Sequence, residues 1–404
     1  ITKGGTWNAY PLKYQYWFML ESFKACNNFK RKHPKPPTDE EDWDSLEELQ
    51  AELEEEKEYN ETSNHRIIGV TFETRPDAIA ESTVAHMRKQ GCTRVELGLQ
   101  ATDDEILENT RRGHTVEQFR EAMFLLRKAG FKVDLHFMPD LPGSTPQKDV
   151  EMYKEVFSDE GLKPDMIKIY PTVVVESADL YNWLQEGKYD PHSEKELFNA
   201  LKQMKLETPR YCRISRLIRD IPEDEIEGDM VTNLREELQK TLAEEGKRCV
   251  CIRCREIGRQ KDNIDSDAEV KLFTDEYKTE GGEEKFISIE DEDRTGVFGF
   301  LRLRLPEKEY RTDEEIFDYI PEVEDCAFIR ELHVYGKMAA IGKDPSDSSQ
   351  HKGFGKQMMV EAESQARKAG FDKIAVISGV GVRKYYENQF GYKKEGTYMV
   401  KNLD

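Results

Sequence analysis

The sequence predicts an α/β protein in which a parallel sheet, open or closed into a barrel, precedes a second and differently built α/β region. Strand and helix patterns alternate between residues 65 and 225, and the strands are almost continuously apolar. That combination is typical of parallel strands covered by helices on both faces. After a polar stretch near 256–280, residues 286–305 have the pattern of an antiparallel hairpin. A chain of 404 residues is also too long for one ordinary core, so we expect two or three domains.

The elements of the first region follow in order. Strand patterns cover residues 66–75, 92–100, 131–143 (with a loop at its end), 165–175 and part of 210–222. A helix is predicted over 76–91, with Pro76 at its start and Gly91 at its end. Another is predicted over 115–130, where Thr115 and Gln118 have the spacing of a capping box. A third begins at residue 146, and a helical region extends to Lys205.

Polar residues stand where these strands end. They are Glu73-Thr74-Arg75, Gly98-Leu99-Gln100, Met138-Pro139-Asp140 and Tyr170-Pro171-Thr172. In parallel α/β folds the carboxyl ends of the strands usually form the site. We therefore expect a binding or catalytic site at this edge of the sheet.

The second region begins after a helix near 231–246 and a cysteine cluster. Its predicted elements are the hairpin 286–305, a strand over 328–336, a Gly-rich turn leading into an amphipathic helix over 350–370, a strand over 372–379, a short helix over 382–391 and a terminal strand over 392–401. Such an order predicts a second domain with a mixed sheet.

Composition narrows the class of protein. No apolar run approaches the roughly 20 residues that span a bilayer, so we expect no membrane partner. Seven cysteines, odd in number and mostly isolated, disfavour a secreted disulfide framework, and we expect a cytoplasmic protein. The net charge of −21 is uneven, because residues 39–58 hold twelve acids against Lys57. We interpret this run, and a second at 313–325, as a solvated insertion or helix face.

A Gly-rich turn, Gln350-His351-Lys352-Gly353-Phe354-Gly355, lies between a predicted strand and helix. Glycines there let backbone N–H groups face a phosphate at a helix N-terminus, and Lys352 and Lys356 add charge. The order of strand, turn, helix, strand and a helix with Tyr385 and Tyr386 resembles the GCN5-related acetyltransferase family.

This resemblance implies an acetyl-CoA site. The pyrophosphate would lie on Gln350, Lys352, Gly353, Phe354, Gly355 and Lys356, and the pantetheine would pair with Glu331, Leu332, His333 and Val334. A tyrosine near the thioester sulfur would be catalytic, because a phenol can donate a proton to a leaving thiolate. Of Tyr385 and Tyr386 we favour Tyr385, with the other ring packed in the core.

Loop motifs of the first region resemble the radical S-adenosylmethionine (SAM) barrel enzymes. They are Gly4-Gly5-Thr6, "ETRPD", "ELGLQ", "RRGHT" and "MPDLPGST", in that order. The resemblance implies that Gly4, Gly5, Thr6, Glu73, Arg75 and Gln100 contact SAM.

Both halves together resemble one family, the catalytic subunit of Elongator and its archaeal homologues, over nearly the whole chain except the acidic insertion at about 34–64. The resemblance implies a tRNA carboxymethyluridine synthase that uses acetyl-CoA and SAM and binds the anticodon region of tRNA. Accessory subunits and a homodimer are left open. We divide the chain into a partial radical-SAM barrel (1–225), a linker with the cysteines (226–280) and an acetyltransferase domain (281–404).

The chain departs from the radical SAM pattern in one place. Those enzymes hold a [4Fe-4S] cluster on three closely spaced cysteines upstream of the Gly-Gly motif, whereas Cys26 and Cys92 are isolated. We favour an N-terminally truncated form over a natural protein without radical chemistry. We expect no SAM cleavage by this chain, with acetyl-CoA binding retained.

Cys249, Cys251 and Cys254 are spaced C-x-C-x-x-C. Three thiolates at this spacing suit tetrahedral zinc, with Cys26, Cys212, a histidine or an aspartate as the open choices for the fourth ligand. Three free thiols are the alternative interpretation.

Local basic clusters are the candidate RNA contacts of this acidic chain. They are Lys30-Arg31-Lys32, then Arg213, Arg216 and Arg219, and then Lys247, Arg248, Arg253, Arg255, Arg259 and Lys261 around the cysteines. Reversing the charges of Arg253 and Arg255 is expected to weaken tRNA binding. Two other functions stay open: a protein lysine acetyltransferase, with Glu331 or His333 as base, and a tRNA-binding scaffold without turnover.

Overall fold

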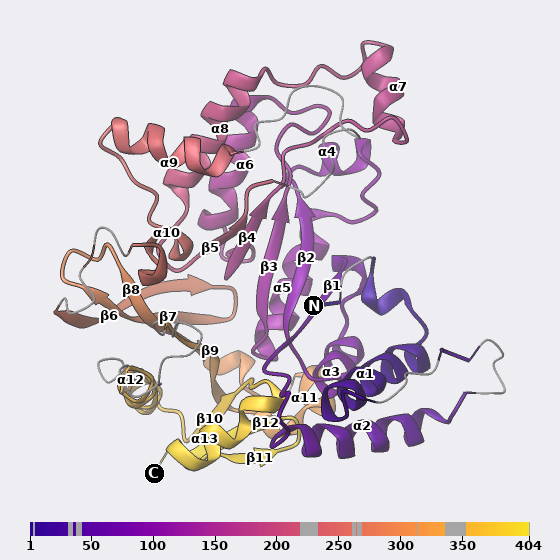
Figure 1. The fold of residues 1–404 in the computed structure, drawn as a ribbon, viewed down its shortest axis with the longest axis vertical. Coiled ribbons are helices and arrows are strands. Elements are labelled where there is room, and N and C mark those ends of the chain that lie inside the picture. Colours follow the sequence, from indigo (N-terminus) through magenta and orange to yellow (C-terminus); the bar gives the residue numbers. More distant parts are fainter. Residues whose placement is uncertain are drawn as a thin grey trace.

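The computed structural model describes residues 1–2, 5–30, 35–37, 43–218, 233–260, 264, 269–312, 314–335 and 353–403. Two sheets organise them (Figure 1), one of five strands and one of seven. Of the predicted site residues, Gly4, Arg219, Gln350 and Lys352 lie outside the described residues, as do Arg31, Lys32 and Lys261.

The N-terminal sheet is entirely parallel, in the order β1-β2-β3-β4-β5. Its strands are β1 (Val70–Thr74), β2 (Cys92–Gln100), β3 (Lys132–Phe137), β4 (Met166–Ile169) and β5 (Arg213–Arg216). The predicted parallel sheet is thus confirmed, although most strands are shorter than the sequence suggested. An isolated parallel bridge between Thr2 and Phe72 continues the sheet beyond β1.

Helices connect these strands, as parallel pairing requires. They are α3 (Glu81–Lys89), α4 (Asp104–Asn109), α5 (Val116–Lys128), α6 (Pro146–Ser158), α7 (Asp179–Gln185) and α8 (Glu194–Glu207). The capping box of Thr115 and Gln118 is present at the start of α5. The helix predicted from Pro76 is divided into a 3-10 turn, η3 (Pro76–Ala78), and α3.

Two α-helices precede β1, α1 (Leu12–Asn27) and α2 (Leu46–Asn60). A short 3-10 turn, η1 (Trp7–Ala9), comes before α1. The acidic run therefore forms a helix where it is described. Ser45 and Glu48 cap α2, and Leu49 and Leu53 are buried. Its acids also bind the C-terminal half, because Lys394 contacts Glu54 at 2.6 Å and Glu58 at 3.0 Å.

Along the chain, α9 (Leu234–Glu244), α10 (Ile252–Arg255) and η5 (Ile257–Arg259) come after the last strand of the first sheet and before the first strand of the second. Ile252 N–H donates to the Cys212 carbonyl at 2.9 Å, which fixes α10 beside the start of β5.

The C-terminal sheet has the order β11-β12-β10-β9-β8-β7-β6. Its strands are β6 (Val270–Thr279), β7 (Gly282–Asp291), β8 (Val297–Pro306), β9 (Cys326–Val334), β10 (Lys373–Val376), β11 (Lys393–Glu395) and β12 (Tyr398–Asn402). β9 and β10 are parallel, and the other neighbours are antiparallel. The predicted hairpin is β7–β8. The single terminal strand predicted over 392–401 is wrong, because β11 and β12 form a hairpin that turns at Gly396, whose φ is +51°.

Helices α12 (Phe354–Lys368) and α13 (Arg383–Phe390) accompany this sheet, with α11 (Glu315–Tyr319) and the 3-10 turns η6 (Lys308–Tyr310), η7 (Pro321–Val323) and η10 (Val380–Val382). Met358, Met359 and Ala362 of α12 are buried in the core of this half. Within the described residues, no helix combines the length and the apolar character that a membrane crossing needs.

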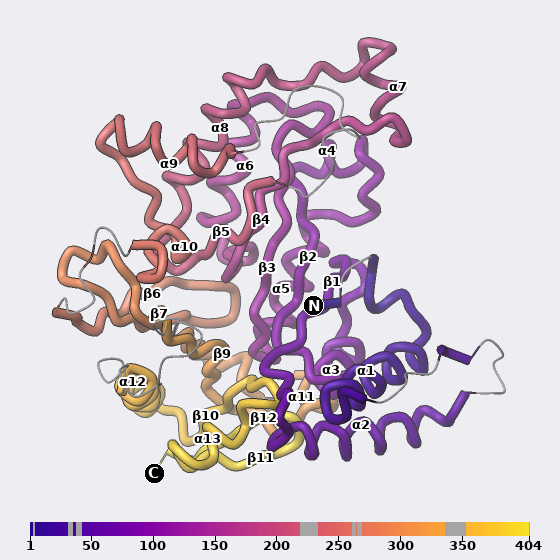
Figure 2. Tube along the Cα trace, viewed as in Figure 1, coloured from indigo at the N-terminus to yellow at the C-terminus, as the bar shows by residue number. Residues whose placement is uncertain are grey.

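The two halves are joined by a buried seam. Figure 2 traces β10 and β12 passing below the starts of β1 to β3. Arg330 of β9 contacts Asp165, just before β4, with nitrogen–oxygen distances of 2.5 and 2.8 Å. A Cβ atom added to Gly379 would lie 2.0 Å from the Ile68 carbonyl oxygen, so the backbones meet there without room for a side chain. The seam places both halves against one shared cavity.

Candidate functional site

A cavity of about 520 Å³ lies at the seam. From the C-terminal half it is lined by Arg330, Glu331, Leu332, His333, Val334, Val376, Ile377, Ser378, Gly379, Val382, Tyr385 and Tyr386. From the N-terminal half it is lined by Ile1, Ile68, Gly69, Thr71, Thr93, Arg94 and Lys132. The strand residues and both tyrosines that the sequence predicted for acetyl-CoA thus face one space.

The end of β9 supplies an open strand edge. β9 and β10 are in register only from Cys326 to Ile329 on β9, and Glu331–Val334 lie beyond the last pair with β10. On its other side β9 remains paired with β8 as far as Val334. An extended amide chain such as pantetheine can add to an edge of this kind through main-chain hydrogen bonds.

Tyr385 and Tyr386 differ in environment. Tyr386 is 6% exposed and packs in the C-terminal core, whereas Tyr385 is 44% exposed. Partial burial raises the pKa of the Tyr385 phenol above its usual value, so that phenol is protonated at neutral pH. Tyr385 is therefore the one of the pair whose hydroxyl can act on a ligand in the cavity.

The start of α12 lies beside Tyr385. A Cβ atom on Gly355 would be 2.8 Å from the Tyr385 hydroxyl oxygen, and Gly353 has a φ of +121°, which favours glycine. Phe354 and Gly355 occupy the first positions of the helix, with Lys356 next. A helix N-terminus of this type attracts anions, so its placement suits a phosphate-bearing ligand.

Glu331 is a salt-bridged carboxylate. Its oxygens lie 3.3 Å from Lys132 Nζ and 3.0 Å from Arg302 Nε. Burial alone would raise its pKa, but these two cations together lower it to about 2. Glu331 is thus a poor proton acceptor, which disfavours it as the base of an amine acetyltransferase. His333 lies against the rings of Phe300 and Tyr335, with centroids 5.7 and 4.5 Å away.

The second site is the carboxyl edge of the parallel sheet. Glu73 is the penultimate residue of β1, and Arg75 directly follows the strand. Arg75 contacts Asp77 at 2.8 Å and the Gly113 carbonyl at 3.1 Å. Thr2 pairs with Phe72 in parallel, which brings Gly5 and Thr6 to the level of the end of β1. The structure therefore gathers the described members of the predicted SAM set at one edge.

Buried polar atoms at this edge have no partner within the described residues. They are Thr74 Oγ1, Gln100 Oε1 and His114 Nδ1. Gln100 also has a φ of +74°, a left-handed conformation that is costly outside glycine. A buried polar atom usually has a hydrogen-bond partner. The edge thus fits a polar ligand such as SAM, and a neighbouring cavity of about 260 Å³, lined by Met138, Thr172 and Trp183 among others, offers apolar walls.

Below this edge lies a buried charged group inside the parallel sheet. Lys168 of β4 pairs with Glu96 of β2 and lies 3.2 Å from Nε2 of His136 on β3. His136 Nδ1 is in turn 3.9 Å from Glu73. Lys168 and Glu96 are 3% and 1% exposed. The group connects the sheet interior with the predicted SAM edge.

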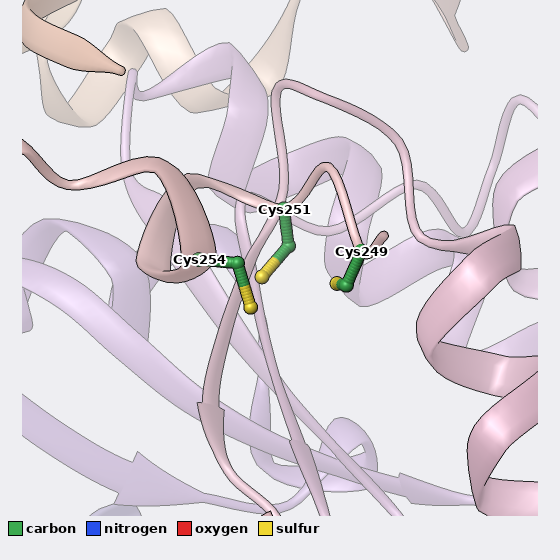
Figure 3. A group of neighbouring side chains, drawn as sticks. All are labelled: Cys249, Cys251 and Cys254. Carbon is green, nitrogen blue, oxygen red and sulfur yellow. The ribbon is translucent and has the colours of Figure 1, made fainter. Parts of the chain in front are cut away.

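The sulfur atoms of Cys249, Cys251 and Cys254 lie within 4.8 Å of one another (Figure 3). Hydrogen bonds from the other two thiols, together with the charges of Lys205 and Arg235, lower the pKa of Cys254. Lys205 is fully buried, with Nζ 3.8 Å from Cys254 Sγ. Zinc with three thiolates carries a net charge of −1, which would balance this lysine, so the donor set fits zinc.

No fourth metal ligand joins this group among the His, Cys, Asp and Glu side chains that the structure describes. Cys212 and Cys26, two of the choices that the sequence left open, are outside it. Gln239 Nε2 approaches Cys254 Sγ at 3.6 Å instead. The predicted zinc site is therefore a three-cysteine centre whose fourth ligand stays unassigned.

The predicted RNA-binding arginines lie in different environments. Arg216 is exposed, and Arg213 and Arg253 are half-buried. Arg255 is 3% exposed and contacts Glu290 of β7 at 2.7 Å. This placement corrects the expectation that Arg255 contacts RNA, because its guanidinium is buried between the linker and the C-terminal sheet.

Comparisons with known proteins agree with this geometry. The Radical SAM superfamily model matches residues 37–156, and the Radical_SAM C-terminal domain model matches residues 164–244. The tRNA uridine(34) acetyltransferase of Methanocaldococcus jannaschii is 40% identical over 410 residues, covering 100% of this chain and 71% of the relative. Elongator complex protein 3 of Danio rerio is 35% identical over 407 residues, covering 100% of this chain and 69% of the relative.

The chain belongs to the Elongator complex protein 3 family. A solved structure supports this assignment: Methanocaldococcus infernus Elp3 with an N-terminal deletion (1–46) matches with a TM-score of 0.85 and 38% identity, covering 99% of this chain and 89% of that one. The family resemblance and the fold class, a radical-SAM-type parallel α/β unit followed by an acetyltransferase-type mixed sheet, are thereby confirmed. The exact domain boundaries stay predictions, and β6 already joins the C-terminal sheet from Val270.

Sequence reasoning missed several residues of this Elongator complex protein 3 relative. Glu96, His136 and Lys168 interrupt otherwise apolar strands, a signal that could have identified them, because charged residues are rarely buried without a partner. Thr74 was named among the polar residues at the strand ends but not as a SAM contact, and His114 was not singled out within its quoted motif. Their importance follows from buried atoms, which no sequence pattern reveals.

Proposed function

We propose that this chain acts in the modification of uridine at the wobble position of tRNA, with acetyl-CoA as acetyl donor and SAM at the second site. The observation that carries the proposal is the seam cavity, where Glu331–Val334 and Tyr385 meet residues of the radical-SAM-type half. The names of the relatives, tRNA uridine(34) acetyltransferase and Elongator complex protein 3, supply the substrate class.

Acetyl-CoA, when bound, supplies an acetyl group activated as a thioester. In our proposal the open edge of β9 binds the pantetheine amides, and the start of α12, with Gly353, Phe354, Gly355 and Lys356, holds the phosphates. The Tyr385 hydroxyl donates a proton to the leaving thiolate, or orients the thioester carbonyl. Gln350 and Lys352 belong to the same predicted phosphate site.

SAM, when bound beside an iron–sulfur cluster, would supply a carbon radical that can abstract hydrogen. Among the described residues of this half, Cys26, Cys92 and Cys212 do not form the three-cysteine group that holds such a cluster, so our proposal for this chain is SAM binding without SAM cleavage. We propose that Gly5, Thr6, Glu73, Arg75 and Gln100 orient SAM. His136, which lies next to Glu73, would add a polar ring to the side of the edge that faces SAM. Lys168 and Glu96 would fix the orientation of His136. The buried polar atoms of Thr74 and His114 support this use of the edge.

Thioester hydrolysis tests the proposal and separates it from its alternatives. The chain is incubated with acetyl-CoA alone, with tRNA, and with a lysine-containing peptide, and free thiol and acetyl-peptide are measured. We expect release of CoA that depends on tRNA. Peptide acetylation without tRNA would indicate a lysine acetyltransferase, and absence of turnover in all three reactions would indicate a scaffold. The salt-bridged state of Glu331 favours the first outcome over the second.

A further inference from the structure

Four arginines from four elements lie near one another beside the three-cysteine centre. They are Arg213 of β5, Arg235 of α9, Arg253 of α10 and Arg259 of η5. Glu256 contacts Arg213 at 2.6 Å and Arg259 at 3.1 Å. Its first oxygen also accepts a hydrogen bond from Tyr335 at 3.3 Å. Glu256 therefore pairs directly with two of the four arginines, and Arg235 lies beside the cysteine thiols instead.

Two guanidinium nitrogens of this group are buried and have no partner within the described residues. They are Arg235 Nη1 and Arg253 Nε. Arg235 is otherwise held by a hydrogen bond of 3.4 Å to the Ile214 carbonyl. Leaving a buried donor unsatisfied is costly, and more so when it is charged. A planar guanidinium group can donate two parallel N–H hydrogen bonds to two oxygens of a phosphate, which is a bidentate contact.

The position of Arg253 depends on the residues on either side of it. α10 is fixed on one side by Cys251 and Cys254 of the three-cysteine centre. On the other side Arg255 contacts Glu290 at 2.7 Å and donates to the carbonyls of Val250 and Arg210, both at 2.7 Å. A metal that ties the cysteines together would therefore also fix Arg253 within the arginine group.

We propose that Arg213, Arg235, Arg253 and Arg259 form a binding site for phosphates of an RNA backbone, and that metal in the three-cysteine centre holds this site in its binding geometry. The proposal rests on the proposed function for the choice of tRNA as the natural RNA. A phosphate of CoA is the other source of the same chemistry. We favour RNA because none of the four arginines lines the seam cavity.

The test uses the full chain with its metal content known from elemental analysis. Arg235→Gln and Arg253→Gln are compared with Lys188→Gln, a control that removes an exposed cation paired with Glu186. Affinity for tRNA, for an unstructured RNA of equal length and for CoA is measured over a range of salt concentrations. Each cluster variant is expected to lose about tenfold in RNA affinity at low salt. The slope of log affinity against log salt should also become shallower by about one.

Removing the metal is the second arm. A chelator should lower the RNA affinity of the wild-type chain by about tenfold, and added Zn²⁺ should restore it. CoA affinity should stay unchanged, which separates this effect from general unfolding. In Arg253→Gln, whose site is already weakened, the chelator should change RNA affinity by a smaller factor.

The outcomes separate this proposal from the proposed function. Wild-type RNA affinity and salt slope in both cluster variants would overturn it, as would a loss of CoA affinity without a loss of RNA affinity. RNA binding that ignores the chelator would overturn the role of the metal. If tRNA and the unstructured RNA bind with equal affinity and both lose affinity in the arginine variants, the phosphate site is supported. That result would remove support for tRNA as the specific substrate.

Discussion

Replacing Asp165 with Asn tests whether the two halves work as one unit. The carboxylate oxygens of Asp165 lie 2.5 and 2.8 Å from the guanidinium nitrogens of Arg330. One of these oxygens also lies 3.4 Å from a guanidinium nitrogen of Arg302. The second oxygen of Asp165 also accepts a hydrogen bond of 3.0 Å from the Val133 N–H. All three charged side chains are at most 5% exposed. The substitution removes the buried negative charge and keeps the side-chain volume.

Breaking a buried ion pair by removing one partner costs about 3–5 kcal/mol. We expect the lower end, about 3 kcal/mol, because Arg330 retains Glu284 at 3.0 Å and Arg302 retains Glu331 at 3.0 Å. With about 2 cal/mol/K of unfolding entropy per residue, that loss lowers Tm by about 4 °C in a chain of 404 residues. Urea unfolding and thermal melts measure these quantities.

The pH dependence supplies a second readout. The guanidinium groups of Arg330 and Arg302 overcome the effect of burial and hold the pKa of Asp165 well below its usual value. A lowered folded-state pKa stabilises the fold above the unfolded pKa, and this contribution disappears as pH falls through the folded pKa. The gap between wild type and Asp165→Asn should therefore shrink below about pH 4.

The matched control is Glu186→Gln, which removes an exposed pair with Lys188 and should change stability by no more than about 0.5 kcal/mol. Acetyl-CoA affinity should fall in Asp165→Asn, because Arg330 lines the seam cavity. A variant that matches the control in both stability and acetyl-CoA affinity would refute the coupling of the two halves.

Three further predictions concern the two sites. Tyr385→Phe should reduce thioester hydrolysis by about 100-fold while acetyl-CoA still binds; an unchanged rate would exclude Tyr385 as proton donor. Gly379→Ala should lower the free energy of unfolding by up to about 3 kcal/mol, because its new Cβ would lie 2.0 Å from a carbonyl oxygen. The control Gly258→Ala, which has open space around it, should leave the free energy of unfolding nearly unchanged. Equal urea midpoints for the two variants would contradict the close contact. Lys168→Met should lower the free energy of unfolding by about 3 kcal/mol, because it removes the ammonium that pairs with Glu96. It should also weaken SAM binding measured by calorimetry. Wild-type stability together with wild-type SAM affinity would show that the buried group supports neither the fold nor the SAM edge.

Much of the fold could be predicted because local patterns carry it. The buried parallel strands are apolar along their length, and β2 coincides with the predicted range 92–100. The Thr115 capping box locates the start of α5 to the residue. β6 was assigned to the linker because it is an edge strand with many exposed polar side chains. The hairpin of β11 and β12 was missed because its turn depends on the positive φ of Gly396.

The site could be predicted only as far as its motifs reach. The motif order associated Tyr385 with Glu331–Val334, and both line the seam cavity. That Lys132 and Arg94 of the other half share this cavity follows from tertiary contacts between residues about 200 positions apart, such as Lys132 and Glu331. The burial of Arg255 likewise depends on Glu290, which lies in another element. The spacing of residues along the chain predicts neither the shared cavity nor the burial of Arg255.

The most direct test of the central claim is the rate of acetyl-CoA hydrolysis by this chain with saturating tRNA that carries uridine at the wobble position. The same tRNA with cytidine at that position is the comparison. We expect tRNA with the wobble uridine to stimulate release of CoA, and we expect the cytidine substitution to reduce the stimulation. Equal rates with both tRNAs, or no stimulation by either, would contradict wobble uridine modification at the seam of the two halves.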